Sequence, residues 1–310
     1  MCAKKMRKVF PEEGSVYDYH YDMKNMCFMN YCDMCEFNET NLVCDLVVPT
    51  KDFVCNMNLA QMLVNNNCPI MFMGPMSSGK SLLCQEFMKN MSNSWNFKEM
   101  PFSRKTIHQD VQNMMEENMI KRRKNVYCLD SCRRTMLMID DMNMPRRDRY
   151  NDHSAVEMLR WMMEYQCVWD YNTLDRRMVQ DMMIMGTVCS NQYEPLTKRF
   201  TSKFNMIGCP EISDFNMNHI FQTMLYNRMK KYPQNIRCMC PEISETCVNV
   251  LNFFRNNYQN ENCCPLTIRE PLRVVQSICS LSPKDIYSST DMTNLCCNEL
   301  MRVFCDRLPS

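Results

Sequence analysis

An eight-residue stretch, Gly74 to Ser81, constrains the fold of this chain more than any other feature of its sequence. It reads Gly-Pro-Met-Ser-Ser-Gly-Lys-Ser and satisfies the pattern G-x-x-x-x-G-K-S/T. The apolar run of residues 69–73 precedes it, and residues 81–88 follow with apolar side chains at helical spacing. A strand, a glycine-bearing loop and a helix N-terminus in this order surround phosphate groups with backbone N–H donors. The sequence therefore predicts a β-loop-α unit that binds a nucleoside triphosphate.

The residues of this stretch have distinct predicted roles. Lys80 neutralises the β- and γ-phosphate oxygens, and Ser81 is a ligand of Mg²⁺. Ser77 and Ser78 stand where such loops often carry glycine or threonine, and their small side chains remain compatible with the approach of a phosphate. The alternative is a chance loop with a solvated lysine, which the preceding strand and the following helix disfavour. The predicted nucleotide-binding residues are Gly74, Pro75, Met76, Ser77, Ser78, Gly79, Lys80 and Ser81.

A second apolar run, residues 136–139, ends in Asp140 and Asp141. Mg²⁺ requires a carboxylate opposite the phosphate loop, and an attacking water requires a polar group beside it. Asp140 is therefore predicted to hold the metal together with Ser81, and Asp141 to orient the water. An acidic turn after an apolar strand is common, but its position about sixty residues after the loop favours this interpretation. Most hydrolases of this type carry glutamate at the second position, so the shorter Asp141 predicts slow hydrolysis.

Other apolar runs predict further strands. Residues 182–189 are typical of a strand that is buried on both faces, residues 204–209 are predicted to form the last strand, and residues 95–102 are predicted to hold one more. Helical patterns lie between these runs. Strands that alternate with helices predict an α/β fold with a doubly wound parallel sheet.

The helical patterns give three specific expectations. Apolar residues at three- and four-residue spacing predict a helix over residues 107–124 that ends in a basic run, where positive charge complements the helix dipole. A second helix passes through Leu159, and Asp152 is expected to cap it. A short amphipathic helix from about residue 58 is expected to have Leu59, Met62 and Leu63 on its apolar face.

The pattern also suggests a division of the chain. Residues 1–45 show no sustained period and predict an irregular or strand-poor lead-in. Residues 46–209 are predicted to form the α/β nucleotide-binding subdomain. Amphipathic patterns after residue 210 predict an all-helical subdomain over residues 210–310, and no heptad run is long enough for a coiled-coil stalk.

Composition limits the partners and the compartment. Apolar residues make up 45% and charged residues 23%, which is typical of a globular protein with a buried core. A net charge of +1 and the lack of a long apolar run predict neither nucleic acid nor membrane as a partner. The 22 cysteines could form disulfides, but the chain size, the lack of a signal peptide at the Lys-rich start and the phosphate-loop motif favour reduced thiols in the cytoplasm. A zinc site at Cys32 and Cys35, with Cys27 and His20 nearby, is a weaker hypothesis because no second pair follows at the required spacing.

Several segments together resemble the third AAA+ module of dynein heavy chains, axonemal dyneins especially. These segments are Val48-Pro49-Thr50, the Gly74 to Ser81 loop, Ile139-Asp140-Asp141-Met142-Asn143-Met144-Pro145, Leu159-Arg160-Trp161, Pro195-Leu196-Thr197-Lys198-Arg199-Phe200 and Ile268-Arg269-Glu270. The resemblance runs from about Gly14 to the C-terminus, and the Asp-Asp-Met-Asn-Met-Pro segment is its most specific part. It implies an AAA+ large subdomain and a helical lid with ATP and Mg²⁺ bound between them, in a six-module ring that moves along microtubules.

The resemblance also implies roles for residues outside the loop. Asn191 or Ser190 resembles the sensor of the γ-phosphate, and the short segment after them leaves the choice open. Arg199 resembles the arginine finger that reaches the nucleotide of the neighbouring module, and Arg269 resembles the second sensor on the lid. The implied partners are the neighbouring AAA+ modules, with dynein intermediate and light chains and microtubules engaged only through the complete heavy chain. The implied location is cytoskeletal, in the axoneme of a cilium.

Two alternatives remain at the level of sequence. A non-catalytic scaffold is favoured by Asp141 and by the altered sensor segment, whereas Lys80 and Ser81 oppose it. An independent homo-oligomeric AAA+ ATPase would require Arg199 to reach Lys80 of an identical neighbour. A single module is not a motor, so the resemblance implies either a piece of a longer heavy chain or a stand-alone relative.

Overall fold

The computed structural model divides the chain into two compact units. One unit comprises Met1–Cys55 with Ile212–Ser310, the other comprises Asn56–Glu211, and the division falls within helix α1 (Lys51–Asn65). The structure describes residues 10–11, 13–22, 25–34, 47–91, 93–130, 132–170, 173, 175–191, 195–230, 232–258, 265–281 and 288–306.

The unit Asn56–Glu211 is built on a five-stranded parallel sheet with the strand order β11-β3-β10-β7-β4. The predicted α/β class with a parallel sheet is confirmed. The central strands carry almost only buried apolar side chains, as expected where helices cover both faces. The strands are β3 (Ile70–Gly74), β4 (Trp95–Pro101), β7 (Arg134–Asp140), β10 (Met182–Cys189) and β11 (Asn205–Gly208).

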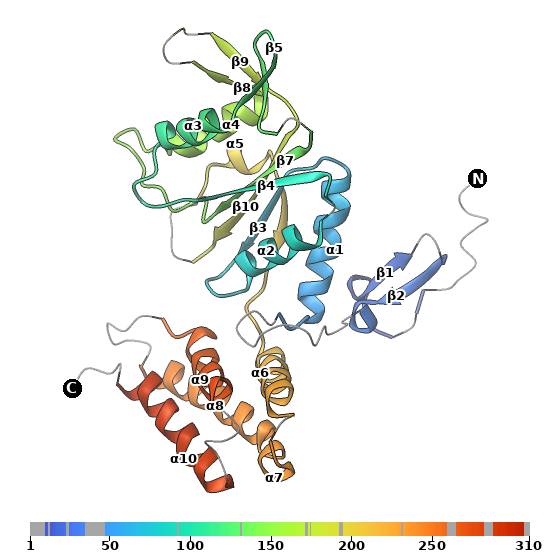
Figure 1. The fold of residues 1–310 in the computed structure, drawn as a ribbon, viewed down its shortest axis with the longest axis vertical. Helices are drawn as coiled ribbons and strands as arrows, with labels where there is room; N and C mark the ends of the chain where they lie inside the picture. The colour runs from blue at the N-terminus through green and yellow to red at the C-terminus, as the bar shows by residue number, and fades with distance from the viewer. Residues whose placement is uncertain are drawn as a thin grey trace. The chain divides into compact units, whose positions relative to one another are not determined.

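Helices cover both faces of this sheet (Figure 1). One face carries Leu137, Ile139 and Ile184, which share a buried cluster with side chains of α3 (His108–Glu117), α4 (Ser154–Tyr165) and α5 (Lys198–Thr201). Because side chains alternate along a strand, their neighbours in sequence point to the opposite face. That face is covered by α1 and by α2 (Lys80–Asn90), whose buried residues include Leu83 and Phe87.

The predicted helix over residues 107–124 is wrong beyond Glu117. Helix α3 ends there, and the Asn118 side chain donates to the carbonyl oxygen of Met114. The basic run forms β5 (Ile120–Arg123), the edge strand of a second sheet with the order β5-β6-β9-β8. Asn125 takes a left-handed φ of 58°, which allows the turn between β5 and β6. The other strands of this sheet are β6 (Val126–Cys128), β8 (Cys167–Trp169) and β9 (Arg176–Val179).

Two further local predictions are corrected. The N-cap of α4 is His153, and among the described residues the Asp152 carboxylate accepts a hydrogen bond from the adjacent His153 N–H and not from the N–H groups within α4. Helix α1 buries Asn56, Ala60 and Val64, whereas Leu59 and Met62 are exposed by 39% and 52%. The helix is therefore rotated relative to the prediction, because the small Ala60 allows a closer approach to the sheet than a leucine would.

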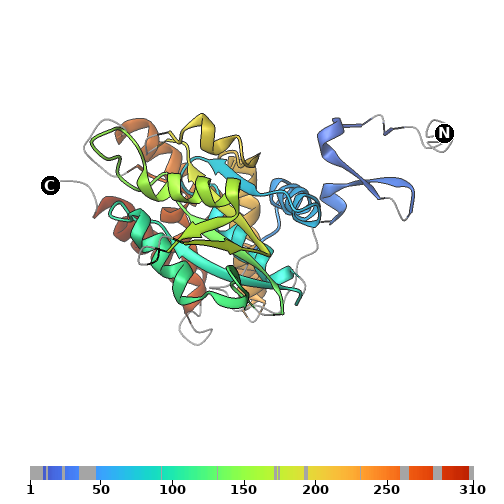
Figure 2. The same ribbon diagram turned by 90° about the horizontal axis from the view of Figure 1, so that it is seen from above.

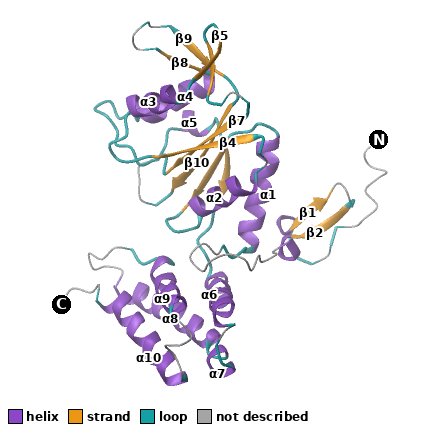
Figure 3. Ribbon diagram, viewed as in Figure 1, coloured by secondary structure: helices purple, strands orange, loops and turns teal. Residues whose placement is uncertain are grey.

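Where the structure describes the chain after Ile212, its secondary structure is helical, as predicted for this part of the chain (Figure 3). Their shared core contains buried thiols together with Phe221, Leu251 and Val274. Burial raises the pKa of the Cys247 and Cys279 thiols to about 12, so both act as apolar fillers. The helices are α6 (Asp214–Met229), α7 (Gln234–Arg237), α8 (Cys240–Tyr258), α9 (Arg269–Ser280), α10 (Ser289–Leu300) and the π-helix η5 (Met301–Cys305).

The lead-in predicted to be irregular or strand-poor contains two short strands between residues 19 and 30. Strands β1 (Tyr19–Asp22) and β2 (Cys27–Asn30) run antiparallel side by side in both views (Figures 1 and 2). The Tyr21 and Phe28 rings pair across the two strands, with centroids 5.0 Å apart, and Met26 takes a left-handed φ of 54° in the turn. The sequence signal is weak because each strand has only four residues.

The structure bears on the predicted state of the cysteines, on the zinc hypothesis and on membrane-spanning helices. The cysteines that the structure describes are free thiols. Cys35 lies outside the described residues, and within those described no group of three His, Cys, Asp or Glu side chains could hold a metal. Of the helices that the structure describes, none combines the length and the apolar character that a bilayer span requires.

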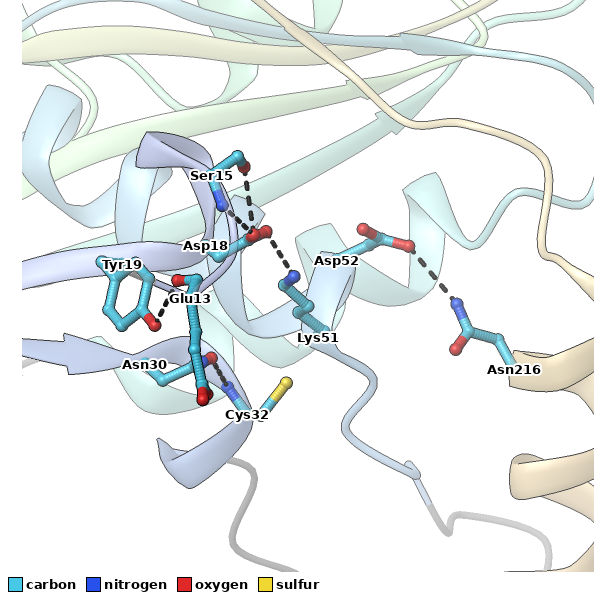
Figure 4. Close-up of polar contacts among 9 residues, drawn as sticks. All are labelled: Glu13, Ser15, Asp18, Tyr19, Asn30, Cys32, Lys51, Asp52 and Asn216. Carbon is cyan, nitrogen blue, oxygen red and sulfur yellow. Dashed lines mark hydrogen bonds and ion pairs between the residues drawn. The ribbon is translucent and has the colours of Figure 1, made fainter. Parts of the chain in front are cut away.

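The first turn of α1 connects separate segments of its unit (Figure 4). The Lys51 ammonium forms an ion pair with Asp18, whose carboxylate also accepts hydrogen bonds from the N–H and the hydroxyl of Ser15, at 2.7 and 3.0 Å. The adjacent Asp52 accepts a hydrogen bond of 3.3 Å from the Asn216 amide on α6. Two neighbouring residues of α1 thus hold the N-terminal segment and helix α6.

The Lys51–Asp18 contact predicts a pH dependence. The Lys51 ammonium, followed by the Ser15 donors, lowers the pKa of Asp18 from 3.8 to about 2. A carboxyl whose pKa is lower in the folded protein stabilises it above pH 4, and this contribution is lost as the pH falls from about 4 to about 2. Lys51→Met should raise the Asp18 pKa toward 3.8 without reaching it, since Ser15 still donates. An NMR titration of the carboxyl measures this change, and an unaltered pKa would show that the ion pair does not form.

Candidate functional site

The loop from Gly74 to Ser81 connects β3 to α2 and requires unusual backbone angles. Gly79 has a φ of 86° and Ser77 a φ of 61°, both in the left-handed region. At Gly74 a Cβ atom would lie 2.1 Å from the carbonyl oxygen of Cys209, so only glycine fits between the loop and the segment after β11. The predicted strand, loop and helix are present in this order.

Lys80 is the first residue of α2 and is only 6% exposed. Its ammonium donates to the carbonyl oxygens of Gly74 and Pro75, at 3.0 and 2.6 Å, and lies 3.4 Å from Ser78 Oγ. These acceptors all belong to the loop that the lysine closes. The arrangement places a buried positive charge inside the loop, at the end of α2 where the helix dipole also favours anions.

Ser81 and Asp140 meet across two elements that are far apart in sequence. The Ser81 hydroxyl lies 2.9 and 3.0 Å from the two carboxylate oxygens of Asp140. Strand β7 ends at Asp140 and β3 ends at Gly74, and parallel strands bring both ends to one edge of the sheet. The hydroxyl and the carboxylate form the oxygen pair predicted to hold the metal.

Asp141 follows β7 with a left-handed φ of 50°. Its backbone N–H donates to the hydroxyl of Thr187 on β10 at 2.9 Å, and the same hydroxyl lies 2.5 Å from Asp140 Oδ1. Thr187 was not among the predicted site residues, since one threonine in an apolar strand carries no local signal.

Asn143 is a second residue that sequence reasoning missed. Its side-chain amide donates to the Cys189 carbonyl at 2.7 Å and its amide oxygen accepts from the Cys189 N–H at 3.2 Å. This pair of bonds fixes the segment after Asp141 to the end of β10. Asn143 belongs to the Asp-Asp-Met-Asn-Met-Pro segment, the most specific part of the resemblance. Its place in that segment was the only signal in the sequence for a role.

The sensor candidates lie beside the loop. The Ser190 N–H donates to the Gly74 carbonyl at 3.0 Å, and the Ser190 hydroxyl lies 2.8 Å from Asn191 Oδ1. Both residues are exposed. The structure therefore brings Ser190 directly to the phosphate loop and Asn191 next to it.

Of the two arginines with predicted roles, Arg199 is not brought to the loop by any described contact. Arg199 is exposed on α5, and no hydrogen bond or ion pair of the described residues joins its guanidinium to residues 74–81. Arg269 belongs to the other unit, where it begins α9. Its N–H donates to Thr267 Oγ1, and the Glu270 carboxylate accepts from the N–H and hydroxyl of Thr267, at 2.7 and 3.0 Å.

The polar groups around the loop fit a triphosphate with Mg²⁺. Ser77 Oγ is buried and has no hydrogen-bond partner among the described residues. No atom lies within 4 Å of where a Cβ of Gly79 would stand, so this side of the loop has room for a ligand. Mg²⁺ prefers hard oxygen ligands such as the hydroxyl of Ser81 and the carboxylate of Asp140.

Comparison with known proteins agrees with this geometry. Residues 35–212 match the family described as “P-loop containing dynein motor region”. The human “Dynein axonemal heavy chain 6” is 25% identical over 308 residues, covering 96% of this chain and 7% of that protein. The human “Dynein axonemal heavy chain 12” is 26% identical over 324 residues, covering 96% of this chain and 10% of that protein. The chain thus spans a tenth or less of the length of these relatives.

The matched region contains the whole phosphate loop, the acidic end of β7 and all of the five-stranded sheet. The similarity to axonemal dynein heavy chains extends beyond it over nearly the full chain. Because the match covers more than half of the 310 residues, this chain belongs to the family of P-loop dynein motor regions.

Proposed function

We propose that this chain binds ATP with Mg²⁺ at residues 74–81 and acts as a nucleotide-binding AAA+ module of a dynein heavy chain. The observation that carries the proposal is the convergence of Lys80, Ser81 and Asp140 at one edge of the parallel sheet. These three residues come from two elements that are about sixty residues apart. A chance loop would leave its lysine solvated, whereas Lys80 is only 6% exposed at the N-terminus of α2.

The chain's own groups would divide the work. The Lys80 ammonium and the amides at the start of α2 would bind the phosphate oxygens. Ser81 and Asp140 would hold Mg²⁺, which when bound neutralises phosphate charge during phosphoryl transfer. Ser190, beside the Gly74 carbonyl, and the adjacent Asn191 would face the terminal phosphate.

Hydrolysis is proposed to be slow. A general base must come within hydrogen-bond reach of the water that it activates. Asp141 has one methylene fewer than glutamate, and its backbone is fixed to Thr187, so it has little freedom to extend. The module would then retain ATP for long periods and influence the motor by its nucleotide state more than by its turnover.

The place of the module in a larger assembly rests on the resemblance. The segment from Asp140 to Pro145 resembles the third of six modules in the ring. Arg199 would then reach the nucleotide of a neighbouring module, and Arg269 would act as the second sensor of this one. Intermediate and light chains and microtubules would be engaged only through the complete heavy chain, in the axoneme of a cilium.

Calorimetric titration of the chain with ATP tests the proposal. One molecule of ATP should bind per chain in the presence of Mg²⁺, and binding should weaken when EDTA removes the metal. ADP should also bind, because Lys80 and the loop amides contact the phosphates that ADP retains. Absence of heat with either nucleotide and of any thermal stabilisation would refute the nucleotide site.

Replacement of Asp141 by glutamate is expected to increase ATP turnover at least about tenfold, since a positioned general base contributes about 10²- to 10⁴-fold. The added methylene brings the carboxylate closer to a water beside the terminal phosphate. ATP affinity should change little because in the proposed scheme Lys80 and the loop amides bind the phosphates, and Ser81 and Asp140 hold Mg²⁺. Steady-state phosphate release at saturating ATP measures the change.

Asp181→Glu is the matched control for Asp141→Glu. Asp181 also has a left-handed φ, at 57°, so glutamate meets the same backbone constraint there. It precedes β10, whereas the phosphate loop lies at the ends of the strands. Turnover that is unchanged in Asp141→Glu, with ATP still bound, would show that side-chain length does not limit hydrolysis.

A further inference from the structure

Thr187 occupies a central position next to the proposed metal site. It is 0% exposed and lies on β10, the strand between β3 and β7. Its register partner on β3 is Phe72, and its neighbour Gly186 is paired with Ile139 on β7. Thr187 therefore stands on the same face of the sheet as Asp140, one strand away from it.

The hydrogen bonds of the Thr187 hydroxyl have a defined direction. A hydroxyl has one proton and can accept through its oxygen. The Asp141 N–H can only donate, so the oxygen of Thr187 accepts that bond, at 2.9 Å. The single hydroxyl proton is then available for Asp140 Oδ1, at 2.5 Å. One buried hydroxyl thus contacts the side chain of Asp140 and the backbone of Asp141.

A second bond strengthens the connection to Asp141. The Met142 N–H donates to the Thr187 carbonyl at 2.9 Å. Both N–H groups that follow Asp140 are thus bound to the same residue of β10. Aspartate tolerates a left-handed backbone at modest cost, and these two bonds hold Asp141 in that conformation.

We propose that Thr187 is a positioning residue that fixes the metal-binding carboxylate of Asp140 and the backbone of Asp141 relative to each other. This inference rests on the proposed function for its consequence, since Asp140 matters as a ligand only if Mg²⁺ and nucleotide bind. By donating to Oδ1, Thr187 holds the carboxylate in the orientation in which it meets the Ser81 hydroxyl.

Two substitutions separate the hydroxyl from the rest of the side chain. Thr187→Val keeps the size and branching of the side chain and removes both hydrogen bonds of the hydroxyl. Thr187→Ser keeps the hydroxyl and removes the methyl group. Thr135→Val is the matched control, because Thr135 is 1% exposed on β7 and its hydroxyl has no partner among the described residues.

The first measurement is hydrogen exchange of the Asp141 amide in the chain without nucleotide. A buried hydrogen bond contributes about 1.4 kcal/mol, so its loss in Thr187→Val should accelerate exchange about tenfold. Exchange in Thr187→Ser and Thr135→Val should stay within about twofold of the rate in the original chain. Both variants keep a hydroxyl at position 187 that accepts the hydrogen bond from the Asp141 N–H. Equal exchange in Thr187→Val and the original chain overturns the proposal.

The second measurement is the increase in ATP affinity that Mg²⁺ produces, obtained by titration with Mg²⁺ and with EDTA. In Thr187→Val, the increase in ATP affinity that Mg²⁺ produces should be about tenfold smaller than in the original chain. The ATP affinity in EDTA should be unchanged, since Lys80 and the loop are unchanged. Thr187→Ser should retain the increase. An equal loss in both variants, or no loss in Thr187→Val, overturns the positioning role.

The two measurements separate this inference from the proposed function. If the original chain binds no nucleotide, the proposed function fails, whereas the exchange of the Asp141 amide still decides whether Thr187 fixes Asp141. If nucleotide binds and exchange is unaffected by Thr187→Val, the proposed function stands and the role of Thr187 is refuted.

Discussion

Substitution of Lys80 by methionine is expected to weaken the binding of MgATP by a factor on the order of a hundred or more. Lys80 is 6% exposed, and its ammonium lies within the loop that is proposed to hold the phosphates. Removing one partner of a desolvated charge pair costs several kcal/mol, because the phosphate charge is left without its counter-charge. Methionine retains an unbranched apolar stem and removes only the charge and its donors.

The variant should remain folded. The Gly74 carbonyl also accepts from the Ser190 N–H at 3.0 Å, and the Pro75 carbonyl also accepts from Ser78 Oγ at 2.9 Å. Both carbonyl oxygens that accept from the Lys80 ammonium therefore keep a hydrogen-bond donor after the substitution. The thermal unfolding midpoint without nucleotide should shift by only a few degrees, and this measurement verifies that lost binding is not lost structure.

Lys89→Met is the matched control for Lys80→Met. Lys89 lies on the same helix, is exposed and pairs with Glu86 at 2.5 Å. Exposed ion pairs contribute little, so both stability and ATP affinity should stay close to those of the original chain. Equal ATP affinity in Lys80→Met and Lys89→Met would mean that the buried ammonium does not contact the phosphates, and the proposed function would lose its main support.

The sequence predicted the parts of the site whose signals are local. Residues 74–81 carry a spaced pattern between a strand and a helix, and Asp140 ends an apolar run. In both cases the residues that define the feature lie within about ten positions of one another. The parallel sheet followed from the same kind of signal, since strands buried on both faces appear as continuous apolar runs.

Thr187 could not be predicted because its role depends on residues distant in sequence. Asp140 is 47 positions away, and only the pairing of β10 with β7 brings the two side chains together. A threonine in a strand is ordinary by itself, since β-branched residues favour strands. The same limit applies to Asn143, whose partner is the backbone of Cys189.

The errors in local structure also have identifiable causes. The basic residues that follow α3 fit a helix end and an exposed edge strand equally well, and the left-handed turn at Asn125 determines the strand. The buried face of α1 was misassigned because Leu59 and Met62 are the largest apolar residues there, whereas Ala60 and Val64 pack against the rest of the unit. Side-chain size indicated the wrong face because close packing of a helix favours small residues.

Gly74→Ala is expected to destabilise the chain by about 3 kcal/mol or more and to abolish tight ATP binding. A Cβ atom at this position would lie 2.1 Å from the carbonyl oxygen of Cys209, far inside contact distance. The Cys209 backbone cannot move away easily, because its N–H donates to the Met73 carbonyl at 2.7 Å and so pairs β11 with β3. Relief of the clash must therefore displace either the edge strand or the phosphate loop.

Gly208→Ala provides the matched control for this prediction. Gly208 is the last residue of β11, directly before Cys209. Its φ is not in the left-handed region, and apart from its chain neighbours no atom lies within 4 Å of where its Cβ would stand. The unfolding free energy of Gly208→Ala should stay within about 0.5 kcal/mol of that of the original chain. Urea unfolding compares the two variants, and calorimetry with MgATP compares their affinities.

The pair distinguishes a steric requirement at Gly74 from a general sensitivity of the edge strand. If both variants unfold at the urea concentration of the original chain and bind MgATP as tightly as it does, the loop does not approach Cys209 as closely as the structure has it. If both are destabilised alike, any side chain on this edge is harmful and Gly74 has no special place. Destabilisation confined to Gly74→Ala, together with lost affinity, would establish that glycine is needed there because the phosphate loop packs against the backbone of Cys209, directly after β11.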